Sequence, residues 1–280
     1  MAKKKKNIVL AWLEFISLSI LEKLLLLLPA NLAYEVAEFL ARLVFLVDSK
    51  HRDRTIQHLL HAGVAANFAE ARQMAKKNFI HFSGMFVDTI RFKVVLRSKE
   101  DILRNIEASG DVEVVKKVLS DGSRNVIFLS AHYGNWEVAG ILITCLTNKE
   151  MLTVMRPLDN QYLEKYVIDK RSGYGMKLVN KRNALKPLLK ALGKRESVCL
   201  VADQHAGKDE GVDVRFFGQP ARAHKSPALI QSKTKVPIVV GVFERVAPLK
   251  YRVRVKEPIY FDENRSVQET VQLYTSQIEE

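Results

Sequence analysis

A histidine and a glutamate five positions apart carry the clearest chemistry in this chain. His132 and Glu137 lie in the stretch SAHYGNWE, residues 130–137. An imidazole can take up a proton near neutral pH, and a carboxylate on its second ring nitrogen fixes the tautomer and stabilises the imidazolium that forms. The two residue types together therefore indicate an activated general base.

The elements around this stretch decide whether the two side chains can meet. Residues 125–130 (NVIFLS) are mostly β-branched or aromatic and follow the turn signal DGS, which predicts a buried strand. Gly134 and Asn135 are breaker and N-cap types, and apolar residues recur at helical spacing over 138–146, so we predict a helix from about Asn135. Because helical side chains lean toward the amino end, we expect Glu137 to hold His132 in the preceding loop. The free amides of the first turn can receive a developing oxyanion.

The bulk composition sets the size and class of the fold. With 280 residues and 48% hydrophobic composition, we expect one sizeable α/β domain with an appendage. The 44 Lys and Arg against 31 Asp and Glu give a formal charge of +13. This charge suits an anionic membrane surface, a nucleic acid or an acidic protein carrier, and does not choose among them.

Cysteine usage and motif absences narrow the chemistry. Cys145 and Cys199 both lie in apolar surroundings, which is typical of small buried hydrophobes in a reducing compartment. The sequence has no Cys-x-x-Cys, His-Glu-x-x-His, Walker lysine loop or Gly-rich dinucleotide fingerprint, and the acidic residues at 203–213 do not fit a calcium loop. We therefore expect no metal and no cofactor.

The amino-terminal segment has the composition of a membrane-associated segment. Four lysines at 3–6 precede an apolar stretch over 8–28 that is interrupted by Glu14, Glu22 and Lys23. The stretch is too long and too charged for a secretory signal. It is long enough to span a bilayer, but an ionised residue at mid-membrane costs about 2.5–3.5 kcal/mol, part of which a shallow or tilted insertion avoids. A break at 29–31 and a second apolar helix over 32–47 predict a hairpin that enters one leaflet, with the lysines on the cytoplasmic side.

Two other interpretations of this segment stay open. Both helices can be ordinary packing in a soluble domain, and the lysines can be a solvated tail or a nucleic-acid arm. No aromatic residues interleave the lysines as stacking platforms would, so we favour membrane contact over nucleic acid. The predicted organisation is a membrane-associated helical part over 1–47 and an α/β domain over 48–280.

The rest of the chain alternates between strand and helix patterns. Helices are expected at 52–62, 67–95, 111–119, 160–171, 184–192 and 225–233, and strands at 151–155, 177–180, 198–202, 212–217, 237–243 and 251–255, the last as an edge strand. This alternation predicts a largely parallel central sheet flanked by helices. Since ligands gather at the carboxyl ends of such strands, His132 and Asp203 are expected to share one crevice.

At these residues the chain resembles the lysophospholipid-type acyltransferases of lipid A biosynthesis, which add secondary lauroyl and myristoyl chains. The resemblance covers nearly the whole chain, and its ordered motifs are HRDRTIQHL at 51–59, HYGNWE at 132–137, MRPLDN at 155–160, Arg171 with Gly173, ADQ at 202–204 and FFGQPA at 216–221. Such enzymes usually continue beyond the point where residues 266–280 end. We therefore expect a truncated carboxyl terminus.

The resemblance implies a catalytic dyad of His132 and Glu137. The histidine would deprotonate a sugar hydroxyl as it attacks an acyl thioester, without an acyl-enzyme. Backbone amides of Tyr133, Gly134 and Asn135 would surround the tetrahedral oxygen. Trp136 would flank an acyl chain or anchor the interface, or serve only in the core.

Three further residues align with the family. Arg156 and Arg171 match family arginines, and Arg171 is expected to bind a phosphate of the acceptor because guanidinium matches phosphate geometry. Asp203 is expected either to orient one of these arginines or to cap the following loop. A surface salt bridge is the ordinary alternative for each arginine.

The leading hypothesis is an enzyme at the cytoplasmic face of the bacterial inner membrane that moves an acyl chain from acyl carrier protein to a hydroxyl of a lipid A precursor. The basic surface would steer the acidic carrier. Alternatives in the same fold are a phosphoinositide mannoside or lysophospholipid acceptor, and acyl-coenzyme A as donor. An alternative of another class is a membrane protein with a degenerate site that binds anionic lipid or nucleic acid.

Overall fold

The computed structural model divides the chain into two compact units, and describes residues 7–107, 113–114, 117, 125–172 and 174–280. The helical unit comprises Ile8–Val95, and the sheet unit comprises Leu96–Phe216 and Pro220–Glu280. The helical unit thus continues well past residue 47, where the predicted boundary lay. The predicted helix at 111–119 and the lysines at 3–6 fall mainly or wholly outside the described residues.

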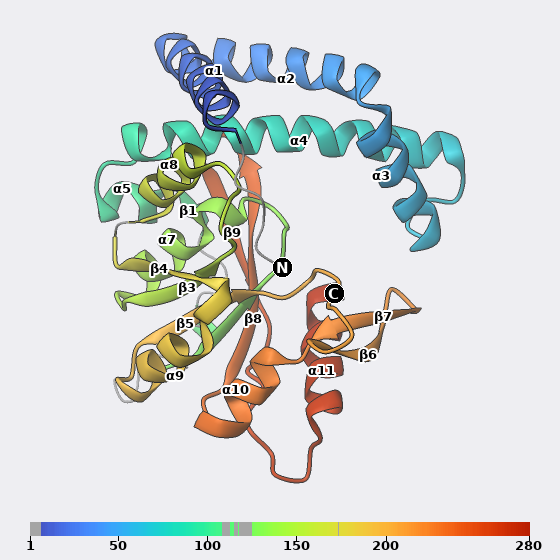
Figure 1. Ribbon diagram of the computed structural model, residues 1–280, viewed down its shortest axis with the longest axis vertical. Helices are drawn as coiled ribbons and strands as arrows, with labels where there is room; N and C mark the ends of the chain where they lie inside the picture. The colour runs from blue at the N-terminus through green and yellow to red at the C-terminus, as the bar shows by residue number, and fades with distance from the viewer. Residues whose placement is uncertain (1–6, 108–112, 115–116, 118–124, 173) are drawn as a thin grey trace. The chain divides into compact units, whose positions relative to one another are not determined.

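A seven-stranded sheet with the order β1-β9-β8-β2-β5-β3-β4 forms the centre of the sheet unit (Figure 1). Its strands are β1 (Ile106–Glu107), β2 (Ile127–Ser130), β3 (Met151–Met155), β4 (Met176–Asn180), β5 (Ser197–Val201), β8 (Ile238–Ala247) and β9 (Lys250–Val255). Strands β8, β2, β5, β3 and β4 are mutually parallel, and β9 pairs antiparallel with β8. The α/β class and the mostly parallel sheet are confirmed.

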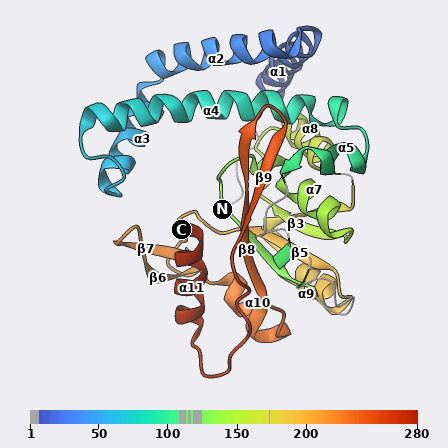
Figure 2. The same cartoon turned by 180° about the vertical axis from the view of Figure 1, so that it is seen from behind.

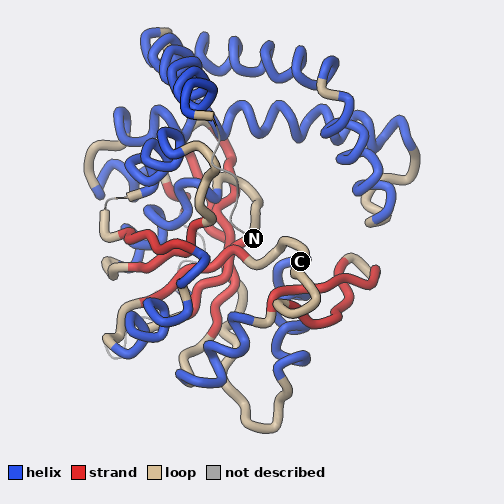
Figure 3. The backbone as a smooth tube through the Cα atoms, in the orientation of Figure 1, coloured by secondary structure: helices blue, strands red, loops and turns tan. Residues whose placement is uncertain are grey.

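Helices cover both faces of this sheet, as Figure 3 shows by colour. The crossovers β2-α7-β3 and β3-α8-β4 run in one direction across the sheet, with α7 (Trp136–Thr147) and α8 (Gln161–Arg171). The return crossovers carry α9 (Leu185–Gly193) and α10 (Ser226–Thr234), so right-handed connection puts them on the other face. Ile127 and Leu129 of β2 pack there against α9, α10 and α11 (Val267–Glu279) in one apolar cluster. Helix α5 (Lys99–Arg104) precedes β1.

Two predicted strands differ from the structure. The run at 212–217 ends at Phe216 as β6 (Gly211–Phe216), which pairs with β7 (Gln219–His224) in a separate two-stranded sheet. The turn between them uses positive φ at Phe217 and Gly218, which the apolar pattern did not indicate. The expected edge strand β9 lies between β8 and the short β1, and its hairpin with β8 is clearest from behind (Figure 2).

The helical unit consists of α1 (Ile8–Leu27), α2 (Ala30–Val47), α3 (Ser49–His61) and α4 (Phe68–Val95). Small residues Ala33 and Ala37 let α2 approach α4, where they pack with Val87 and Ile90. Both expected apolar helices are present. Among the described residues, no helix combines the length and apolar character needed to cross a bilayer.

Candidate active site

The parallel strands bring three predicted site residues to one edge of the sheet. In the register of β2 and β5, Ser130 lies beside Val201, so the residues that follow these strands leave the sheet together. His132 follows β2, Asp203 follows β5, and Arg156 directly follows β3, the next strand along. The predicted meeting of His132 and Asp203 is confirmed, since the two residues are in direct contact.

Asp203, and not Glu137, holds the imidazole of His132. Asp203 Oδ1 lies 2.8 Å from His132 Nδ1, and its Oδ2 accepts a hydrogen bond of 2.9 Å from the His132 backbone N–H. An ionised carboxylate only accepts hydrogen bonds, so Nδ1 carries the proton and Nε2 keeps its lone pair. The side chains are 33% and 20% exposed, which leaves the ring accessible at a half-buried site. The expected role of Asp203 as partner of an arginine or cap of its loop is wrong.

The charge of Asp203 is stabilised by this contact. Burial, the largest single influence, raises its pKa, but hydrogen bonds from the ring and the backbone of His132 together outweigh burial and hold the pKa below its ordinary value. Asp203 is therefore ionised at neutral pH and favours a positive charge on His132 during a reaction.

Two more side chains border the ring of His132. The Gln204 side-chain nitrogen lies 3.5 Å from His132 Nε2 and can donate toward its lone pair. Trp136 packs edge-on against the imidazole, with ring centroids 5.1 Å apart. Gln204 was recognised only as part of the ADQ stretch; its place directly after Asp203, at a strand end, is the signal that could have found it.

The predicted contact between Glu137 and His132 is wrong, because Glu137 binds Arg171 instead. Arg171 Nε and Nη2 donate to the two Glu137 oxygens at 2.6 and 2.7 Å, which is a two-pronged ion pair. The two side chains are 24% and 20% exposed. Glu137 lies in the first turn of α7 and Arg171 is the last residue of α8, so the pair fastens two helices that cover the same face of the sheet.

The turn between His132 and α7 depends on a glycine. Gly134 has φ +62°, and a Cβ there would lie 1.9 Å from the Phe243 carbonyl oxygen of β8. The next residue, Asn135, is fully buried and donates its backbone N–H to the same oxygen at 3.0 Å. The sequence suggested the Asn135 amide as an oxyanion donor, but this amide is already bonded to Phe243. The Asn135 side chain reaches the Tyr251 hydroxyl at 3.4 Å and makes no cap bond to α7.

Arg156 and Tyr133 are also exposed at this edge. Among the described residues, Arg156 has no hydrogen-bond or ion-pair partner, and neither does the backbone N–H of Tyr133. The described residues also contain no group of three His, Cys, Asp or Glu side chains that could hold a metal ion. In the described part of the chain, the site therefore combines the His132 imidazole, held by Asp203, with the Arg156 guanidinium and the Tyr133 amide, which have no partner.

The comparison with protein families agrees with these elements. The family described as bacterial lipid A biosynthesis acyltransferase matches residues 2–280. The chain belongs to this family. A phosphatidylinositol mannoside acyltransferase of Mycobacterium tuberculosis is 29% identical over 129 residues, which are 45% of this chain and 40% of the relative. The Mycolicibacterium smegmatis enzyme of the same name is 25% identical over 118 residues, 41% of this chain and 38% of the relative.

The similarity to the two mycobacterial enzymes covers only part of each protein. The chain spans less than half of the length of those relatives. The names of these relatives and the description of the family both state acyl transfer. The relatives' names give a phosphatidylinositol mannoside as the acceptor, whereas the family is described by lipid A biosynthesis. The family is therefore established over the whole chain, whereas the donor and the acceptor are matters of proposal.

Proposed function

We propose that the protein transfers a fatty acyl chain from a thioester donor to a hydroxyl of a membrane lipid, with His132 as general base. The observation that supports this most is the His132–Asp203 contact, because it puts the proton on Nδ1 and leaves Nε2 as acceptor. An imidazole in this state can deprotonate a hydroxyl without any metal-bound water.

The reaction follows from that protonation state. The Nε2 lone pair of His132 takes the acceptor's O–H proton while the oxygen bonds to the thioester carbonyl carbon, which forms a tetrahedral oxyanion. The carbon–sulfur bond then breaks, and the sulfur takes the proton from His132 and leaves as a thiol. Asp203 stabilises the imidazolium in between and stays ionised. No acyl-enzyme forms.

Of the three backbone amides expected around the oxyanion, we assign this role to the amide of Tyr133. Its N–H has no partner among the described residues and directly follows His132, whereas the Asn135 amide is already bonded to Phe243. A backbone donor at this place stabilises the developing negative charge. Trp136 against the imidazole excludes water from one side of the ring.

The acceptor phosphate is better assigned to Arg156 than to Arg171. Glu137 occupies two guanidinium donors of Arg171 and compensates its charge, so Arg171 offers little attraction to an anion. Arg156 is exposed at the carboxyl end of β3, beside β5. We assign Glu137 and Arg171 the positioning of α7, which carries Trp136.

Acyl carrier protein is the proposed donor, because the net charge of +13 attracts an acidic carrier. A lipid A precursor is the leading acceptor, in line with the family's description. A phosphatidylinositol mannoside is the second candidate, and the names of the mycobacterial relatives favour it. Acyl-coenzyme A and lysophospholipids are further reagents for the same assay.

Membrane contact is proposed for α1 and α2. Their exposed large apolar side chains are Ile8, Val9, Leu10, Trp12, Leu13, Ile20, Leu24 and Leu27 on α1, and Leu32, Phe39, Leu40, Leu43, Val44, Leu46 and Val47 on α2. Apolar surface of this extent is typical of helices that lie in the interface of one leaflet. We propose that this is the cytoplasmic leaflet. Leu24→Glu should lower binding to anionic vesicles, whereas Leu185→Glu, equally exposed on α9, should not.

The proposed transfer is tested with purified protein, labelled acyl carrier protein and each acceptor in turn. We expect product with one acceptor, and a loss of about 10²–10⁴-fold in His132→Ala. His205→Ala is the control, because His205 is an exposed histidine on the loop after β5. Equal activity of His132→Ala and wild type would overturn the proposal. Vesicle binding without turnover of any acceptor would support the alternative of a degenerate lipid-binding protein.

A further inference from the structure

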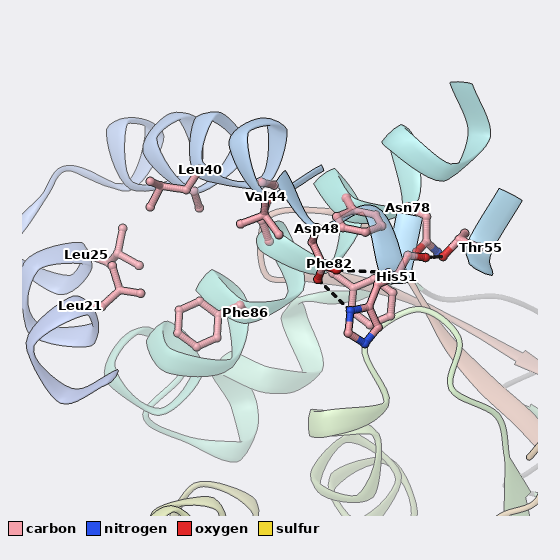
Figure 4. A pocket seen from close by; sticks show the side chains of 14 residues that line it. Leu21, Leu25, Leu40, Val44, Asp48, His51, Thr55, Asn78, Phe82 and Phe86 are labelled. Atoms are coloured by element: carbon pink, nitrogen blue, oxygen red, sulfur yellow. Dashed lines mark hydrogen bonds and ion pairs between the residues drawn. The ribbon is translucent and has the colours of Figure 1, made fainter. Parts of the chain in front are cut away.

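The helical unit contains a groove of its own, of about 550 Å³, lined only by residues of this unit. This volume is within the range of roughly 300–1,000 Å³ that is usual for small-molecule sites. Figure 4 shows Leu21 and Leu25 of α1 at one end, with Phe86 of α4 and Leu40 of α2 between them and the middle. This end offers only carbon to an occupant.

The opposite end of the groove is polar. Asp48, His51, Thr55 and Asn78 gather there (Figure 4). Asp48 accepts from the His51 backbone N–H at 3.1 Å and lies 2.7 Å from His51 Nδ1. The carboxylate fixes the ring, and His51 Nε2 has no partner among the residues that the structure describes. An occupant with an apolar tail and a polar head fits this gradient.

The local charge near the polar end of the groove indicates which kind of polar head group would bind there. Residues 48–81, which include α3 and the first half of α4, carry six Lys and Arg against three Asp and Glu, whereas residues 8–47 carry two against four. Lys50, Arg54 and Lys77 each precede a polar lining residue in the sequence, are exposed, and make no ion pair with another described residue. An anionic head is therefore complementary to this end.

The apolar walls are themselves exposed. Leu40, Val44 and Phe82 line the groove and are 38%, 45% and 43% exposed. An acyl chain in the groove would remove this surface from water, which stabilises the complex by about 25 cal/mol per Å². The groove also continues into the apolar surface of α1 and α2, along which a membrane lipid can enter.

We propose that this groove binds one acyl chain of an anionic membrane phospholipid, with the phosphate at His51 and the neighbouring cations. This is a binding site separate in its residues from the catalytic edge, and it takes no part in the proton transfer. Asp48 keeps the ring of His51 oriented at the phosphate, and the local excess of Lys and Arg over Asp and Glu supplies the positive charge.

Lipid retention by the whole protein tests the proposal. The protein is mixed with phosphatidylglycerol in a neutral detergent, and bound lipid is counted by native mass spectrometry. Wild type should retain one phosphatidylglycerol and bind phosphatidylcholine more weakly. Val44→Trp fills the groove and should lower the affinity by about tenfold or more. Leu43→Trp is the matched control, since Leu43 is equally exposed on α2 and does not line the groove.

Each outcome decides the proposal. Equal retention by Val44→Trp and Leu43→Trp, no retained lipid in wild type, or tighter binding of palmitate than of phosphatidylglycerol would overturn it. Equal binding of phosphatidylcholine would overturn the assignment of the head. His132→Ala should retain lipid as wild type does, so a failure of the acyl transfer proposal and a failure of this one give different results. Circular dichroism of both tryptophan variants excludes unfolding as the cause.

Discussion

Two histidines in this molecule have the same bonding pattern and arise in different ways. In each, one carboxylate oxygen accepts from the histidine's backbone N–H and the other faces Nδ1. Asp48 and His51 are three positions apart, and Asp48 is the N-cap of α3. His132 and Asp203 are 71 positions apart and meet because β2 and β5 are neighbours.

The difference between the two pairs indicates their roles. A local cap pair forms wherever a helix begins in this way, and His51 and Asp48 are 63% and 34% exposed. The long-range pair exists only in the folded sheet, at 33% and 20% exposure. Because water weakens the interaction of exposed charges, we assign the proton transfer to His132 and a binding role to His51.

The largest effect is expected from removing each carboxylate in turn. Asp203→Asn should lower the acyl transfer rate by about 10²–10⁴-fold, because the wrong tautomer becomes accessible to His132. Asp48→Asn should leave the rate unchanged within a factor of about two, since Asn is also a good N-cap. Steady-state rates of both variants measure this.

Rescue separates positioning from folding at Asp203. Asp203→Glu should recover part of the lost rate, and the KM for the acceptor should change little in either Asp203 variant. A rate for Asp203→Asn close to that of wild type would mean that Asp203 does not act through His132.

The two units also differ in what a left-handed glycine does. Gly134→Ala should lower the free energy of unfolding by about 3 kcal/mol or more, because the new Cβ would overlap the Phe243 carbonyl oxygen. Gly63→Ala in the helical unit should cost only about 1–2 kcal/mol, since its φ is +66° and nothing lies within 4 Å. Denaturant unfolding of both variants compares them, and equal losses would contradict the tight turn at Gly134.

A smaller effect is expected where Glu137 fastens α7 to α8. Glu137→Gln should lower the free energy of unfolding by about 1–3 kcal/mol, because Arg171 stays half-buried without its carboxylate. Glu150→Gln removes the partner of Lys177 in a pair that is about half exposed, and should change stability by less than about 0.5 kcal/mol. The same unfolding experiment applies. A negligible loss in Glu137→Gln would show that the pair does not secure the helices.

The smallest effect concerns pH. The pKa of Asp203 is lower in the folded chain than its ordinary value of 3.8, so its contribution to stability is present above that value and is lost as pH falls from there through the lower folded pKa. The pKa of Asp48 is lowered in the same direction by the His51 backbone N–H, but Asp48 is exposed, so its contribution should be smaller.

Unfolding curves of wild type and Asp203→Asn over this acidic range measure that contribution. The stability difference between the two proteins should shrink as the pH is lowered. A difference that stays constant would mean that the Asp203 carboxylate does not gain its charge stabilisation from His132.

The sequence predicted the elements better than the partners. The alternation of apolar runs and helical periodicity predicted β3 and α8, and the N-cap Asn160 begins α8 through hydrogen bonds to residues 162 and 163. The rule that strand ends share one edge predicted the meeting of His132 and Asp203. The strand, the helix and its N-cap could be predicted because they depend on local conformation, which hydrophobic periodicity reports. The contact between His132 and Asp203 could be predicted because it follows from parallel strand pairing.

The assignment of Glu137 to His132 failed for a related reason. Sequence proximity favoured a contact inside one loop and turn, whereas the order of strands and the packing of α8 on α7 are set by long-range burial. Arg171 at the end of α8 therefore binds Glu137, and Asp203 after β5 binds the imidazole of His132. No local pattern reports which strand lies next to which.

The tautomer of His132 tests the central claim most directly. In a two-bond proton–nitrogen correlation spectrum of protein labelled with ¹⁵N-histidine, the signal absent from His132→Gln identifies this ring. We predict a proton on Nδ1 and a bare Nε2 in the neutral ring, and a shift of this balance between the two nitrogens in Asp203→Asn. A proton fixed on Nε2 in wild type would contradict the account.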